Sequence, residues 1–83
     1  MSIDIYDNIA VMSMEIRRKL GFRLKNLRKK YGYTQEQLAE LSDIDYKHIQ
    51  LLESKNPSGA TIDTLEKLAK AFKVSISDLV KFK

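Results

Sequence analysis

Apolar positions recur at helical spacing along most of this chain. Leu20, Leu24 and Leu27 follow one another at intervals of four and three residues, which predicts a helix from about residue 16 to residue 31. Gly32 then provides the residue that most readily adopts a left-handed conformation after a helix. No segment alternates apolar and polar residues in the manner of a strand. The pattern predicts an all-α protein, a compact bundle of non-parallel helices.

Four shorter helices are expected to follow. Thr34 caps the second, with Gln37 three residues later as in a capping box, and a polar break at residues 42–43 ends it. Asp45 caps the third, which runs to about Ser54, and a loop at residues 55–59 contains the only proline. Thr61 caps the fourth and Ser75 caps the fifth. The expected inward positions of these last two helices are Ile62, Leu65, Leu68, Ala69, Phe72, Ile76 and Leu79.

Residues 1–15 are separated from the rest as an N-terminal arm or extra helix, and residues 16–83 are expected to form the domain. Ile5, Ile9 and Met12 continue the helical spacing toward Ile16. One interpretation is a frayed terminus or a later true start at Met12 or Met14, since chain ends are often poorly ordered. The other is an added piece of dimer interface. The residues leave both open.

Composition narrows the range of functions. With 83 residues, 43% of them hydrophobic and 31% charged, the chain suits one small globular domain whose modest core often depends on a partner chain. The absence of cysteine excludes disulfides and thiolate zinc sites and fits a cytoplasmic protein. Apolar runs are too short to predict a membrane span or signal peptide. With one histidine and no glycine-rich phosphate loop, we expect no enzymatic activity, metal or cofactor.

The charge is distributed unevenly. Residues 1–15 contain three acids and no base, so the other 68 residues carry +7 of a chain whose net charge is +4. Eight bases lie in one stretch without an acid: Arg17, Arg18, Lys19, Arg23, Lys25, Arg28, Lys29 and Lys30. Such a stretch is often only a solvated helix face. It also suits a partner such as DNA, because neutralising phosphates supplies most non-specific affinity for nucleic acid.

The second and third predicted helices have the spacing of a helix-turn-helix, whose second helix enters the major groove of DNA. On a helical wheel, the third helix turns Ile49, Leu52 and Glu53 to one side and Tyr46, Lys47 and Gln50 to the other. Lysine can donate to guanine O6 and N7, glutamine can pair with adenine, and tyrosine can pack on a thymine methyl or donate its hydroxyl. These three residues are therefore the predicted base contacts.

The blocks TQEQLA (residues 34–39), YKHIQLLE (46–53) and TIDTLEKLAKAFKVSISDL (61–79) strongly resemble the phage-repressor and Cro-type helix-turn-helix family. This resemblance covers about residues 20–80 and implies a five-helix lambda-repressor-like domain. It implies that Gln35, Lys55 and Asn56 contact DNA phosphates, and that Tyr46, Lys47 and Gln50 contact bases. It also implies a structural salt bridge between Arg28 and Glu53. One departure is Asp43, which stands where the family usually has glycine and would have to be left-handed.

The expected function is that of a sequence-specific transcriptional regulator that binds an inverted-repeat operator in double-stranded DNA as a homodimer. Half-sites about 34 Å apart would place paired recognition helices in successive major grooves. A phage repressor, a restriction-modification controller and a toxin-neutralising antitoxin share this architecture, and the sequence does not separate them. The alternative is an antitoxin or protein-interaction module that uses the same fold mainly to bind a toxin or another regulatory protein.

Overall fold

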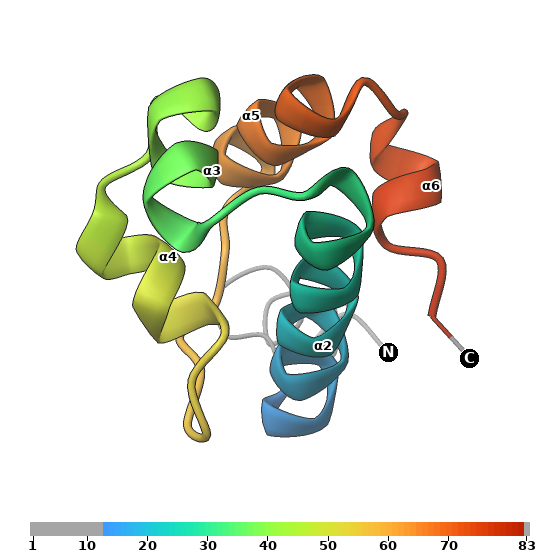
Figure 1. The fold of residues 1–83 in the computed structure, drawn as a ribbon. Helices are drawn as coiled ribbons and strands as arrows, with labels where there is room; N and C mark the ends of the chain where they lie inside the picture. Colours follow the sequence, from blue (N-terminus) through green and yellow to red (C-terminus); the bar gives the residue numbers. More distant parts are fainter. Residues whose placement is uncertain (1–12, 83) are drawn as a thin grey trace.

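The computed structural model describes residues 13–82, which form five α-helices and no strand. The helices are α2 (Met14–Tyr31), α3 (Gln35–Ser42), α4 (Tyr46–Leu52), α5 (Ile62–Phe72) and α6 (Ile76–Leu79). In Figure 1, α2 runs through the middle, α3 and α4 lie on one side of it, α6 lies on the other and α5 crosses one end. The all-α prediction is confirmed. The predictions for Ile5, Ile9 and Met12 concern positions outside the described residues.

Helix α2 is longer than its apolar spacing indicates. Ser13 caps it, with its hydroxyl oxygen accepting from the Ile16 amide at 3.2 Å, so the helix begins at Met14, two residues before the predicted start. Gly32 ends the helix with a left-handed φ of 75°, as predicted. No helix within residues 13–82, α2 included, is long and apolar enough to cross a membrane.

Reciprocal hydrogen bonds fix the start of α3. The Thr34 hydroxyl accepts from the Gln37 amide at 3.0 Å, and the Gln37 side-chain oxygen accepts from the Thr34 amide at 2.8 Å. The predicted capping box is therefore confirmed. At the other end of α3, Asp43 has a φ of 58° and takes the left-handed position that glycine would occupy without strain.

Helix α4 differs from its prediction in two ways. Asp45 stands at the N-cap position, but its side chain makes no capping hydrogen bond. The helix also ends at Leu52 rather than Ser54, because the Ser54 amide bonds to the carbonyl of Leu51, only three residues back, and the chain tightens out of the α-helix there.

The core fills the space between all five helices. Its fully buried side chains include those of Leu20, Leu24, Leu38, Ile49, Leu52, Leu68, Phe72 and Leu79. Tyr31 and Tyr33 extend this core, with ring centroids 5.5 Å and 6.1 Å from that of Phe72. The prediction that Ile62 belongs to the buried stripe of α5 is wrong, because Ile62 is 69% exposed. It is the first residue of α5, and burial begins one turn later, at Leu65.

Candidate nucleic-acid interface

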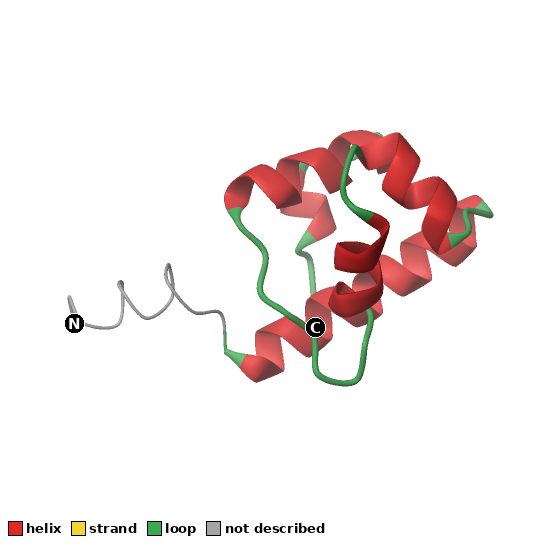
Figure 2. Cartoon of the chain, turned by 90° about the vertical axis from the view of Figure 1, so that its left-hand side faces the viewer, coloured by secondary structure: helices red, strands yellow, loops and turns green. Residues whose placement is uncertain are grey.

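Helices α3 and α4 form a tightly joined pair at the surface. The turn between them buries Ile44, and the Ile44 amide donates to the carbonyl of Ala39 at 3.1 Å. Leu38 on α3 and Ile49 on α4 are both fully buried, so the facing sides of the two helices are apolar. Figure 2 is seen from the side of this pair, with α4 facing the viewer in front of α2. Helix α4 is therefore held at the surface by its apolar contact with α3.

The outward face of α4 carries the three residues predicted to read bases. Tyr46, Lys47 and Gln50 are all exposed, and Tyr46 is 40% exposed. On the same helix, Ile49 and Leu52 have essentially no exposure. Leu51 is also turned outward, and half-buried His48 lies between the two faces. Helix α4 therefore has a buried apolar side that packs on the core and an exposed side whose polar, basic and aromatic side chains can contact another molecule.

A buried ion pair joins α2 to the end of α4. The Arg28 guanidinium donates through Nε to Oε2 of Glu53 and through Nη2 to Oε1, each at 2.9 Å. The side chains are only 13% and 3% exposed, respectively. Hydrogen bonding to Glu53 raises the pKa of Arg28 above its usual value, so the guanidinium keeps its positive charge. The structure thus brings together the two residues that the family resemblance pairs.

Two further groups complete this network, and sequence reasoning did not anticipate their contacts. Nη1 of Arg28 donates to the carbonyl oxygen of Tyr33 at 3.0 Å, just before α3. Gln35, at the first residue of α3, donates its side-chain amide to Oε1 of Glu53 at 3.2 Å. The network therefore ties α2, α3 and α4 together. It also holds Gln35, a predicted phosphate contact, at the edge of the α4 surface.

The remaining predicted phosphate contacts follow α4 directly. Lys55 and Asn56 are exposed, whereas the next residue, Pro57, is buried and anchors the loop. The predicted residues thus gather at two places beside the outward face of α4, with Gln35 at the start of α3 and Lys55 and Asn56 in the loop. Every polar side chain at these places can donate hydrogen bonds to phosphate oxygens.

Gly21 determines how closely α2 approaches α4. The residue is buried, and a Cβ atom added to it would collide with the carbonyl oxygen of Leu52. The backbones of the two helices therefore meet at this point, directly beside Glu53, which is ion-paired to Arg28 farther along α2. The sequence gives a signal for this contact, a glycine inside a helical apolar pattern, which often marks a close backbone approach.

A sequence model described as helix-turn-helix matches residues 24–79. The chain belongs to this helix-turn-helix family. Its members of known structure include DNA-binding regulators of the Cro and lambda-repressor type. The matched segment contains α3, α4, the Arg28–Glu53 pair and the loop between α4 and α5. The membership confirms the fold and the class of DNA-binding transcription regulators that the sequence predicted.

Solved structures show the same similarity in three dimensions. The restriction-modification controller protein C.AhdI from Aeromonas hydrophila is 32% identical, with a TM-score of 0.71, over 76% of this chain and 94% of its own. The controller C.Esp1396I bound to a 19 base pair DNA duplex is 34% identical, with a TM-score of 0.70, over 77% and 84% of the two chains.

A curated relative is the competence pilus inhibition repressor of Acinetobacter baylyi, 42% identical over 60 residues. The match covers 72% of this chain but 54% of the relative, so the chain spans about half the length of that protein.

Proposed function

We propose that this protein is a transcriptional regulator that binds an inverted-repeat operator as a homodimer, with α4 in the major groove. The observation that carries the proposal is the two-sided character of α4. Its buried side is locked to the core, while Tyr46, Lys47 and Gln50 are presented together outward. A rigidly held helix with exposed donors suits direct recognition of base edges. Relatives crystallised with DNA, including C.Esp1396I, support the same use of the fold.

Phosphate contacts would position α4 over its bases. Gln35 at the start of α3, and Lys55 and Asn56 after α4, lie beside the proposed reading face. Contacts of this kind set the register of the protein on the duplex without reading sequence. Gln35 reaches this position with its amide already bonded to Glu53, so its phosphate contact would be tied to the same network that orients α4.

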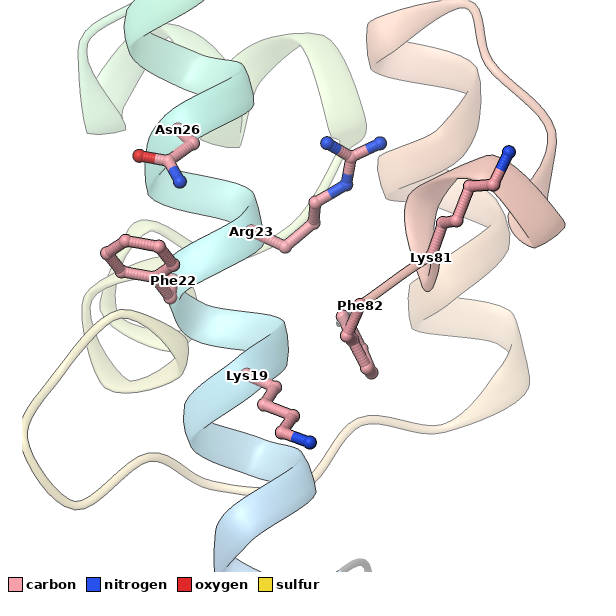
Figure 3. Close-up of a pocket in the computed structure, with 6 residues that line it drawn as sticks. All are labelled: Lys19, Phe22, Arg23, Asn26, Lys81 and Phe82. Atoms are coloured by element: carbon pink, nitrogen blue, oxygen red, sulfur yellow. The ribbon is translucent and has the colours of Figure 1, made fainter.

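The dimer would form on the side of the molecule away from α4. There a cavity of about 220 Å³ lies between α2 and the C-terminal residues, lined by Lys19, Phe22, Arg23, Asn26, Lys81 and Phe82. In Figure 3, Lys19 and Arg23 extend from the edge of α2 that faces Phe82, and Phe22 and Asn26 lie on the other edge of the helix. Phe22 is 68% exposed and next to this cavity, an exposed aromatic of the kind that subunit contacts cover. The cations there favour an acidic partner, and residues 1–12 contain Asp4 and Asp7 and no base.

Selection of an operator from a random DNA library, followed by binding of single variants, tests the proposal. Lys47→Ala and Gln50→Ala should each cost about 1–3 kcal/mol at particular base pairs and relax the preference there. Lys70→Ala removes an exposed cation from α5 and is expected to change neither affinity nor preference. If the library yields no preferred sequence, or if both α4 variants keep the wild-type preference, the assignment of α4 as the reading helix is wrong.

A further inference from the structure

The first ten residues of α2 lie before the part of the chain that matches the family. The match begins at residue 24, whereas α2 begins at Met14. Among residues 14–23 there are four cations, Arg17, Arg18, Lys19 and Arg23, and a single acid, Glu15. Glu15 is used within the helix, because Lys19 lies 3.7 Å from its carboxylate. This basic end of α2 is a feature of the chain that the family similarity does not explain.

The cations at this basic end of α2 lie on different faces of the helix. Lys19 and Arg23 belong to the cavity beside the C-terminal residues, where Arg23 donates to the carbonyl of Asp78 at 2.8 Å. Arg17 lies on another face, one turn from Gly21, and its guanidinium packs against the loop after α4. Its Nε would be 3.5 Å, and its Nη2 3.7 Å, from a Cβ atom placed on Gly59. Arg17 therefore lies against the same loop that carries Lys55 and Asn56.

One polar group on each of these two elements lacks a partner. Nε of Arg17 and the hydroxyl of Ser58 are both buried, and neither has a hydrogen-bond partner. Among residues 13–82 no carboxylate lies within salt-bridge distance of Arg17. Buried polar groups are normally satisfied, so the unpartnered Nε marks Arg17 as a guanidinium whose surroundings within the protein do not satisfy it. The Arg17 side chain is only partly buried, and the exposed Lys55 adds a second positive charge on the loop against which Arg17 packs. A phosphate oxygen matches this chemistry.

We propose that Arg17 and the loop of residues 55–59 form a binding site for a DNA backbone phosphate. The site lies beyond the C-terminal end of α4 and adds a contact from α2 to those made by Lys55 and Asn56. The inference rests on the proposed function, because it places the phosphate beside the helix that reads the bases. The contact would lie on the DNA backbone beyond the base pairs that α4 reads. The phosphate would then be held from two elements, α2 and the loop after α4.

Binding of the full chain to two labelled duplexes, the selected operator and a scrambled version, tests the site at several potassium chloride concentrations. Arg17→Ala should weaken binding to both duplexes by the same factor. It should also reduce the slope of log affinity against log salt by about one for each bound protomer, since one phosphate contact is lost. Arg17→Gln keeps the aliphatic stem over Gly59 and should lose the same slope, which keeps the test valid if the alanine variant folds poorly. Lys70→Ala removes an equal charge elsewhere and should leave the slope unchanged.

The outcomes separate this inference from the function on which it rests. Wild-type affinity and slope in both Arg17 variants, alongside weaker binding by Lys55→Ala, would overturn the Arg17 site and leave the DNA-binding function intact. An equal loss of slope in Lys70→Ala would also overturn it, because the effect would then follow net charge rather than position. Failure of the unmodified chain to bind either duplex would instead defeat the proposed function itself.

Discussion

Glu53 is the residue on which the geometry of the proposed site depends most. Its two carboxylate oxygens accept from Arg28 on α2, and one of them also accepts from Gln35 on α3. Only 3% of the Glu53 side chain is exposed, so these hydrogen bonds replace the water that would otherwise solvate its carboxylate. A buried pair of this kind can add little net stability compared with apolar residues, but the loss of one partner leaves a buried charge unpaired.

Glu53→Ala should therefore destabilise the fold by about 3 kcal/mol, within the range measured for broken buried pairs. Urea denaturation followed by circular dichroism measures the change. The exposed Glu66 on α5 gives a matched control, and its alanine variant should stay within about 0.5 kcal/mol of the wild type. A Glu53→Ala protein as stable as this control would show that the pair does not hold the helices together. The same variant should also bind DNA more weakly, although Glu53 lies on the buried side of α4 and is not a predicted DNA contact.

At the scale of helices, the crossing of α2 and α4 determines the angle at which α4 is presented. Gly21 makes the approach possible, since there is no space for a Cβ atom against the Leu52 carbonyl. Helix propensity alone would favour alanine over glycine here by about 1 kcal/mol. Packing and propensity therefore predict opposite effects at this residue, and the collision is with backbone, which cannot rotate away as a side chain can.

Gly21→Ala should consequently lower stability by at least about 1 kcal/mol, in the range of overpacked cores, despite the better helix former. Lys25→Ala at an exposed position of the same helix, outside the cavity lining, should have a neutral or slightly stabilising effect. Thermal unfolding of the three proteins in parallel measures both changes. A Gly21→Ala protein that melts above the wild type would mean that α4 can shift away from α2 at little cost.

For the whole molecule, the two proposed interaction surfaces lie on opposite sides of α2. Figure 1 shows α4 and its loop on one side of α2 and α6 on the other. The cavity lies on the α6 side, between α2 and the C-terminal residues Lys81 and Phe82. This separation would let two copies associate through the cavity side while both α4 helices stay free for DNA. A C2 contact of that kind is made by the same surface on each subunit.

Sedimentation at micromolar concentration should therefore show a dimer of the full chain. Phe22→Ala should weaken it at least about tenfold, as expected for a buried interfacial aromatic. Leu41→Ala, which removes another exposed apolar side chain on α3, should leave the dimer unchanged. Deletion of residues 1–12 should also weaken association if the acidic segment meets the cations of the cavity. A monomeric full chain would contradict the dimer, and equal effects at Phe22 and Leu41 would contradict its location.

Local patterns predicted most of the fold because helix ends are decided by nearby residues. The capping box at Thr34, the left-handed residues Gly32 and Asp43, and the buried stripe of α2 each depend on groups within a few positions along the chain. Predictions were less accurate at the ends of helices. Asp45 stands at the predicted N-cap position without making the capping bond, whereas the burial predicted for Ile62 is wrong because the apolar stripe of α5 continues past the edge of the core.

The sequence by itself determined the helical class, the helix-turn-helix spacing and the outward face of α4, because these follow from periodicity and from side-chain chemistry. The tertiary structure decided which distant groups meet. The bond from Gln35 to Glu53, the contact of Gly21 with Leu52 and the position of Arg17 against Gly59 join residues 18 to 42 positions apart. No periodic signal specifies such contacts, since they depend on how the helices cross and on which side chains the crossing leaves without partners.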